Sequence, residues 1–199
     1  MGSLHERLER WREYNRISEA GEIARRAFVN NSFDGVLTMM GVVMGNFVVG
    51  VEDPSVVLVT GLSTALAIGI SGGWGAYLTE SAERRQDIDE LEQVTLTELH
   101  DTKIGKASRA AVVTVAAVDG LSPFLAALVV VAPFFLAPLL PSVQYAYYAA
   151  IALALLALFA LGIYLGRLSK RNLIMSGLRT SIAGVVCMGL SYLLERLAR

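Results

Sequence analysis

Two aspartates stand inside long apolar stretches and are the residues of this chain best placed to do chemistry. Asp34 lies in the segment FDGVL and Asp119 in the segment VDGLS, so a glycine follows each of them. A carboxylate at the centre of a membrane helix costs roughly 2.5–3.5 kcal/mol on insertion scales, and it usually faces a bundle interior or a water-filled cavity. The two aspartates therefore indicate a membrane protein that binds or moves a charged species.

The composition of the 199 residues agrees with a membrane protein. Hydrophobic residues make up 54% of the chain and charged residues 18%, and the mean hydropathy is +0.53. Several apolar runs exceed the ~20 residues that a helix needs to cross the hydrocarbon core of a bilayer. The net charge of −1 comes without a basic cluster, so no nucleic-acid partner is expected.

We predict an all-α integral membrane protein whose five spans cover 28–50, 56–78, 110–136, 143–165 and 173–194. The domain organisation then reads as a cytoplasmic amphipathic helix (1–27), a transmembrane hairpin (28–79), an acidic helical connection in the cytoplasm (80–109), a second hairpin (110–166), and a cytoplasmic turn with the fifth span (167–199). Lys and Arg are absent from the loops after spans one and three and gather in the other loops. The positive-inside rule therefore predicts a cytoplasmic N-terminus. No signal peptide is expected, which favours a prokaryotic plasma membrane.

Other side chains could complete a cation site with the two aspartates. On a helical wheel Thr38 shares the face of Asp34, and Asn30 lies one turn before it. Met44 falls about 80° from Asp34 and is the better placed sulfur, and Thr64 belongs to a polar stripe on the second span. Oxygen ligands suit hard divalent ions, and a thioether softens that preference. Two alternatives to a cation site are open. In one the methionines serve only as packing or lipid-facing residues, and in the other each aspartate is a buried structural group that is bonded to neighbouring backbone.

The predicted connection carries four carboxylates at spacings of three, four and three, which place them on one helical face. They form a candidate cation-collecting face and are Glu80, Glu83, Asp87 and Glu90. The alternative is a solvated face with internal ion pairs, because Arg84 and Arg85 are close in sequence. The two histidines, His5 and His100, fall outside the predicted spans, which excludes an intramembrane histidine zinc site.

Three segments resemble a known family. The first span contains DGVLTMMGVVMG (34–45), the second contains GLSTALAIGISGGWGAYL (61–78), and the last contains SGLR (176–179) followed by Gly184 and Ser191-Tyr192. In their order and spacing they resemble the first, second and fifth helices of the vacuolar iron transporter family. The resemblance extends from about Arg25 to the C-terminal end. Five spans with a cytoplasmic connection between the second and third also fit this family.

The resemblance implies a homodimer that exchanges divalent iron or manganese for protons, with no tightly bound cofactor. Members use carboxylates and methionine sulfur from the first two helices near the dimer axis, and Asp34 matches the aspartate of the first helix. The chain departs from the pattern elsewhere: Ala27 replaces an aspartate, Thr64 and Ala76 replace glutamates, and Gly72 replaces a methionine. About 30 residues stand where plant members carry a long glutamate-rich metal-binding insertion.

The leading prediction is a proton-coupled transporter of divalent metal ions that acts in a lipid bilayer and is not an enzyme. A non-transporting scaffold or metal sensor with the same fold is one alternative, and a transporter of a different cation is another. Small-residue pairs such as Gly41/Gly45 and Gly69/Gly73 favour close helix contacts within a subunit or across a dimer. An intramembrane aspartyl protease built on Asp34 and Asp119 is disfavoured, because neither aspartate has the sequence context of that class.

Overall fold

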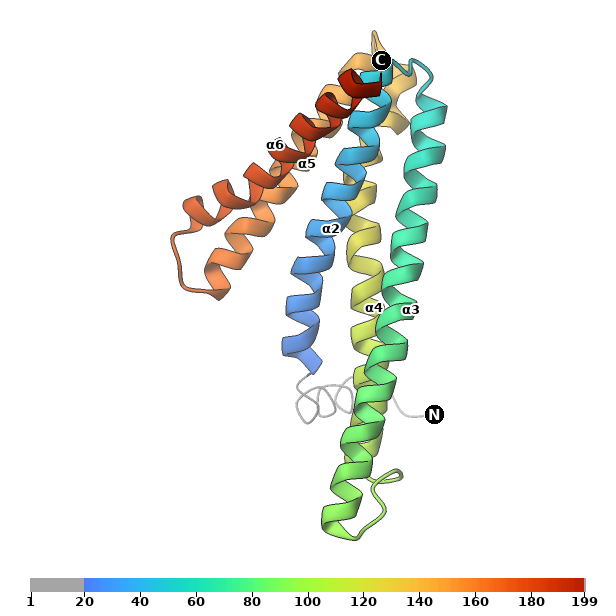
Figure 1. Cartoon of the computed structure of the whole chain (residues 1–199), viewed down its shortest axis with the longest axis vertical. Coiled ribbons are helices and arrows are strands. Elements are labelled where there is room, and N and C mark those ends of the chain that lie inside the picture. Colours follow the sequence, from blue (N-terminus) through green and yellow to red (C-terminus); the bar gives the residue numbers. More distant parts are fainter. Residues whose placement is uncertain (1–19, 199) are drawn as a thin grey trace. The chain divides into compact units, whose positions relative to one another are not determined.

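The structure, a computed structural model, describes residues 20–198 and is helical (Figure 1). The helices are α2 (Ala20–Val49), α3 (Pro54–Thr95), α4 (Lys103–Val131), α5 (Val143–Leu168) and α6 (Leu173–Ala198), and a 3-10 helix, η1 (Ala132–Leu139), follows α4. Five segments are long and apolar enough to cross a membrane, and no strand occurs in the described part of the chain. The predicted all-α fold with five spans is confirmed. Most of the predicted amphipathic helix at 1–27 lies outside the described residues.

Contacts divide the chain into two compact units. The core unit contains residues 29–69 and 122–198, and the charged unit contains residues 20–28 and 70–121 within the described chain. Helices α2, α3 and α4 each contribute residues to both units. Each unit is described separately below.

The core unit is built around apolar side chains from α2, α3, α4, η1 and α5. Phe134 and Tyr147 are its largest fully buried side chains together with Met39 and Met40. The rings of Phe134 and Tyr147 meet edge to face at 4.9 Å between centroids. The Tyr147 hydroxyl donates a hydrogen bond to the carbonyl of Val51 at 2.9 Å, so its one polar atom is satisfied.

Helices α5 and α6 form a hairpin and lie side by side (Figure 1). Gly162 is buried on α5, and a side chain there would collide with Thr180 and with the backbone of α6. The Thr180 hydroxyl also donates to the carbonyl of Leu158 at 2.8 Å. Small residues and a hydroxyl therefore let these two helices approach closely, as is common between membrane helices.

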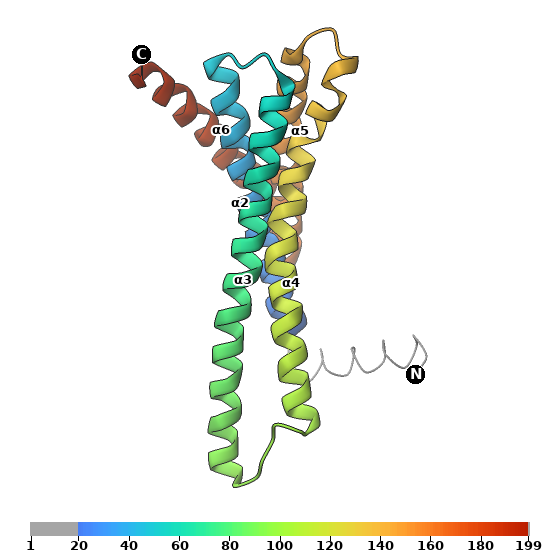
Figure 2. The ribbon, with the colours of Figure 1, turned by 90° about the vertical axis from the view of Figure 1, so that its right-hand side faces the viewer.

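In the charged unit the second half of α3 and the first half of α4 run antiparallel and are joined by residues 96–102 (Figure 2). Gly72 and Gly73 on α3 lie close to the backbone of α4, because a Cβ at Gly72 would lie 2.8 Å from the carbonyl oxygen of Asp119. A Cβ at Gly73 would lie 3.3 Å from the carbonyl oxygen of Ala116. This pair of glycines therefore serves contact within one chain.

Three of the differences between the helix ends and the predicted spans follow from the local sequence. Helix α2 already begins at Ala20, and α3 continues without a break to Thr95, because the charged segments next to the spans consist of Glu, Arg, Ala and other good helix formers. The predicted third span ends earlier as an α-helix, at Val131. The chain then continues as η1, where Pro133 and Pro138 each remove a backbone donor and favour the tighter helix.

Candidate cation-transport site

A strip of three polar side chains runs along α2 at helical spacing. Asn30, Asp34 and Thr38 are all exposed and lie one turn apart. None of the three side chains has a hydrogen bond or ion pair with another described residue. Asp34 lies eight residues after Arg26, which corresponds to about 12 Å along the helix. The carboxylate thus lies inside the apolar segment and presents two unshared oxygens away from the protein core.

The opposite face of α2 explains why this strip points outward. Val36, Met39, Met40 and Val43 are buried in the core unit with almost no exposure. A side chain on Gly45 would meet nothing within 4 Å, so this side of α2 is also open near the end of the helix. The face that contains Asp34 is therefore an open polar surface on a helix of membrane-spanning length.

Met44 lies on the core side of α2. It is 7% exposed and packs in the same cluster as Met39 and Met40. Its sulfur is buried among apolar side chains, whereas Asp34 faces outward. In this conformation the methionine stabilises the core unit, which was the packing alternative for these residues.

Asp119 belongs to the charged unit, whereas Asp34 belongs to the core unit. The Asp119 side chain is half-buried and has a polar partner within the structure. Its backbone lies against Gly72 of α3. The two aspartates share a local sequence but differ in exposure and in their immediate neighbours.

The positions where the family resemblance implies further ligands are packed in this chain. Gly72 has no room for a methionine, because the backbone of α4 already lies against it. Ala76 is buried, with 8% exposure. Thr64 is half-buried, and its hydroxyl donates to the carbonyl of Thr60 at 2.7 Å. Of these three positions, Thr64 alone offers a side-chain oxygen, and that hydroxyl keeps lone pairs that can still accept.

The predicted cation-collecting face lies on the continuous extension of α3. Glu80 is half-buried and forms an ion pair with Arg84 at 3.4 Å. Glu90 accepts a hydrogen bond from Gln86 at 3.0 Å, and Glu83 and Asp87 are exposed. Glu80 therefore already has a cationic partner, while the other three carboxylates remain in contact with solvent.

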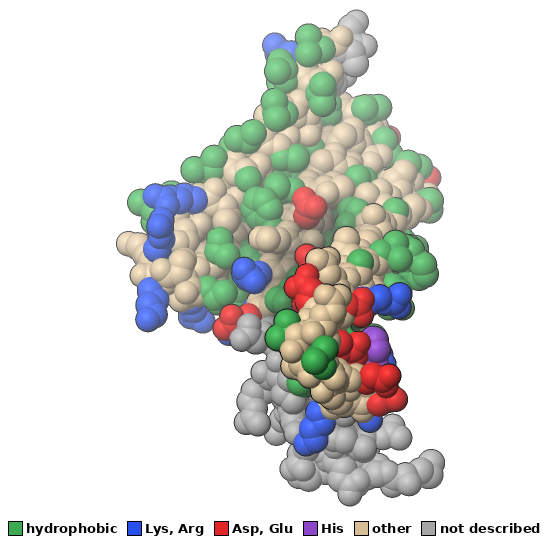
Figure 3. Space-filling model, turned by 60° about the horizontal axis from the view of Figure 1, so that its bottom comes forward, with side chains coloured by type: hydrophobic (Ala, Val, Ile, Leu, Met, Phe, Trp, Pro, Cys, Tyr) green, Lys and Arg blue, Asp and Glu red, His purple; other side chains and the backbone are tan. Residues whose placement is uncertain are grey.

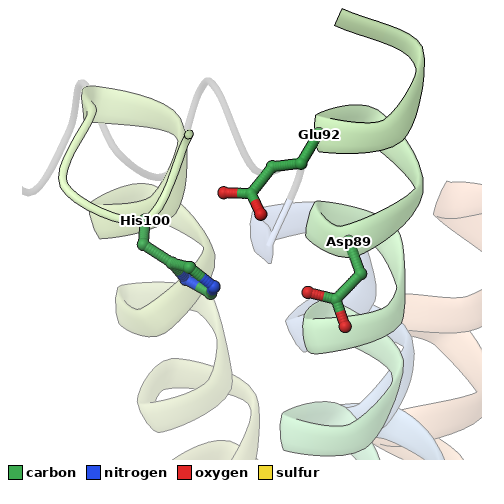
Figure 4. Close-up of side chains that lie close together, drawn as sticks. All are labelled: Asp89, Glu92 and His100. Atoms are coloured by element: carbon green, nitrogen blue, oxygen red, sulfur yellow. The ribbon is translucent and has the colours of Figure 1, made fainter. Parts of the chain in front are cut away.

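A second group of possible metal ligands was not predicted from the sequence. Asp89 and Glu92 project from α3 toward His100 in the loop before α4 (Figure 4). One possible ligand atom from each residue lies within 4.8 Å of the others. Leu99 donates its N–H to Glu92 at 2.6 Å, which draws the loop back onto the helix. Figure 3 shows acidic side chains gathered at this end of the charged unit. Two carboxylates and an imidazole suit a divalent transition metal.

Five helices that are long and apolar enough to cross a membrane define an integral membrane protein, and α2 and α4 each contain an aspartate, Asp34 and Asp119. The model of the VIT family matches residues 25–104 and 86–196, and these matches together cover most of the chain. An uncharacterized protein of Methanocaldococcus jannaschii, MJ0645, is 30% identical over 179 residues, which cover 88% of this chain and 91% of that relative. The chain belongs to the VIT family, whose members are membrane transporters of metal ions.

Proposed function

We propose that the protein transports divalent iron or manganese across the membrane and that Asp34 is the main ligand of the ion. The observation that carries this proposal is the exposed strip of Asn30, Asp34 and Thr38, which has no described partner. A carboxylate with an amide and a hydroxyl one turn away on either side supplies oxygen ligands, which suit hard and borderline divalent ions. Such a strip on a membrane helix needs a polar partner or an ion, because lipid offers neither.

Proton coupling follows from the same carboxylate. A carboxylate can either bind a proton or coordinate a divalent cation, so binding of the metal ion releases the proton. Acidic residues within membrane segments serve as proton relays in pumps and transporters for this reason. We propose that Asp34 alternates between these two states and that Asp119 contributes a second carboxylate to the pathway.

A second copy of the chain is proposed to cover the polar strip. Two strips that face one another across a dimer axis would provide two carboxylates, which balance one divalent charge. The amide of Asn30 and the hydroxyl of Thr38 could then hydrogen-bond across the interface instead of facing lipid. With the N-terminus in the cytoplasm, as the loop charges indicate, the acidic end of the charged unit would face the cytoplasm.

Metal sensing is a second candidate function, and the group of Asp89, Glu92 and His100 favours it. These residues follow Glu80, the first charged residue of α3, and form a possible ion site that does not require an ion to cross the membrane. A sensor would bind metal at this site without net flux. Measurements of flux and of binding on the same preparation therefore separate the two functions.

The test is uptake of a panel of divalent ions into proteoliposomes, with and without a pH gradient. The wild type should move iron or manganese, and Asp34→Asn should reduce uptake to the level of empty liposomes, because the amide keeps the shape but removes the charge. Asp119→Asn should slow uptake or change its pH dependence. Asp53→Asn is the matched control, since this carboxylate lies in the loop before α3 and is exposed.

Wild-type uptake by the Asp34→Asn variant would contradict the carboxylate mechanism. Absence of uptake by the wild type, together with metal binding that His100→Ala abolishes, would favour the sensor. Uptake of a monovalent cation alone would show a transporter with a different substrate.

A further inference from the structure

The charged unit contains a cavity with a strongly basic lining, and the proposed transport mechanism does not use it. Its volume is about 340 Å³, and it lies between α3 and α4. Three arginines and the histidine line it: Arg84, Arg85, Arg109 and His100. Among the described residues, no aspartate or glutamate lines the cavity. In Figure 3 basic side chains lie next to the histidine at this end of the unit. The three guanidinium groups attract an anion to this cavity, and Asp89 and Glu92 lie near His100 but do not line it.

Two of the arginines are held in place by other groups. Arg84 pairs with Glu80, which does not line the cavity, at 3.4 Å between Nε and Oε2. Arg109 donates from a terminal nitrogen to the carbonyl of His100 at 3.1 Å. Arg85 is exposed and has no ion pair or side-chain hydrogen bond with the described residues. Each guanidinium has five N–H donors, so Arg85 and Arg109 keep donors for a ligand.

The far end of the cavity is apolar. Tyr77 on α3 and Val112 and Val113 on α4 complete that part of the lining. Tyr77 precedes Arg84 by seven residues, which corresponds to about 10 Å along the helix. From Tyr77 to Arg84 the lining therefore changes from apolar to basic over roughly the depth that separates acyl chains from the aqueous surface of a bilayer, and Ile88 lines the cavity beyond the arginines.

The sequence places this change at the membrane boundary of both helices. Between Pro54 and Thr79 helix α3 has no charged residue, and Glu80 is the first. On α4, Arg109 is the last charged residue before the apolar run that contains Asp119. Trp74 and Tyr77 are exposed next to this level, and their ring centroids lie 6.1 Å apart. Exposed Trp and Tyr are typical of the interface between lipid and water.

We propose that this cavity binds the phosphate group of an anionic phospholipid. The arginines would form paired N–H···O hydrogen bonds to the phosphate oxygens, and the hydroxyls of Ser81 and Ser108, which also line the cavity, would add further donors. An acyl chain would leave along Tyr77 and Val113, which are exposed on the apolar side. The lipid would bridge α3 and α4 at the point where both enter the membrane. This role is independent of the identity of the transported ion.

The test is native mass spectrometry of the full-length chain in mild detergent, titrated with phosphatidylglycerol or with phosphatidylcholine. The wild type should retain phosphatidylglycerol and not phosphatidylcholine. Arg85→Gln should lower the affinity for phosphatidylglycerol roughly fivefold. The double variant, Arg85→Gln with Arg109→Gln, should lower it by about fivefold once more. The matched control, Arg167→Gln with Arg171→Gln, removes the same charge from exposed positions that do not line the cavity.

An equal loss of adduct in the control pair would overturn the proposal, because surface charge alone would then explain lipid retention. Arg85→Gln separates a lost ligand from a lost fold, since this side chain has no described partner and circular dichroism should remain unchanged. Excess inorganic phosphate tests the source of the anion. Persistence of the phosphatidylglycerol adduct supports a lipid site, whereas its displacement by inorganic phosphate would show a site for the soluble anion and overturn the assignment to lipid.

Discussion

The glycine that follows each aspartate has a packing role that is separate from the carboxylate. A Cβ on Gly35 would collide with the carbonyl of Pro123 in α4. Gly120 lies against Gly73, because a Cβ added to Gly73 would lie 3.4 Å from the Cα of Gly120. Glycine is required at position 35 because two helix backbones approach closely there. The repeated Asp-Gly pair therefore combines a contact between helices with a carboxylate that packing alone does not explain.

Tyr147→Phe should destabilise the core unit while leaving its packing intact. The substitution removes the hydrogen bond to the carbonyl of Val51, whereas the ring contacts with Phe47 and Phe134 remain. The expected loss is about 1 kcal/mol of unfolding free energy, because the carbonyl loses its donor. Thermal unfolding followed by circular dichroism measures it. The control is Tyr148→Phe on the exposed side of the same helix, and an equal change in both variants would contradict the assigned bond.

Asp53→Ala should lower the unfolding temperature by a few degrees at neutral pH, because Asp53 caps α3 ahead of Pro54. Its carboxylate accepts hydrogen bonds from the hydroxyl of Ser55 at 2.7 Å and from the N–H of Ser55 at 2.9 Å. Both hydrogen bonds lower the pKa of Asp53 below its ordinary value of 3.8, and the bond from the hydroxyl has the larger effect. A carboxylate whose pKa is lower in the folded protein than in the unfolded chain stabilises the fold at pH values above the unfolded-state pKa. This stabilisation is lost as the pH falls through the folded-state pKa. The difference between wild type and variant should therefore shrink below about pH 4, and a constant difference down to pH 2 would contradict the cap.

Individual site residues were predictable from the sequence to different degrees. The shared face of Asp34, Thr38 and Asn30 follows from helical periodicity alone, and the structure has all three side chains exposed. The wheel also placed Met44 within reach, but it could not show that this side of α2 packs against the core. The approach of His100 to Asp89 and Glu92 depends on a loop that folds back, and no periodic pattern encodes such a fold.

At the scale of elements, the contact between α3 and α4 determines which ligands the chain can carry. Gly72→Met would introduce the residue that the family resemblance implies at this position. We expect no gain in metal binding and a loss of about 1–3 kcal/mol in stability, because the nearest atoms are backbone and cannot rotate away. Gly75→Met is the control, since a Cβ there meets nothing within 4 Å. Thermal unfolding and uptake in proteoliposomes measure both effects, and a stable Gly72→Met variant with faster uptake would contradict this packing.

The number and order of the helices could be read from the sequence because each apolar run exceeds the thickness of a bilayer. The continuity of α3 beyond the apolar run was harder to predict, since hydropathy marks where a membrane ends and not where a helix ends. Thr79 and Glu80 continue the helix to Thr95, and Thr95 is the last helical residue before the loop at 96–102. The change from α4 to η1 depends on Pro133 and Pro138, which the apolar pattern does not distinguish from further helix.

At the scale of the whole molecule, the polar strip on α2 leads to a prediction about assembly. Within a single chain Thr38 is exposed in the middle of an apolar helix, and a second copy would cover it. Thr38→Cys in a Cys187→Ser background should form a disulfide between two chains in the membrane, because facing residues near a two-fold axis can bring their Cα atoms within about 7 Å. Leu156→Cys on the exposed side of α5 should remain monomeric under the same oxidant. Non-reducing gel electrophoresis of oxidised membranes measures both. Cross-linking at position 156 but not at position 38 would place the interface on α5 and remove the polar strip from the dimer axis.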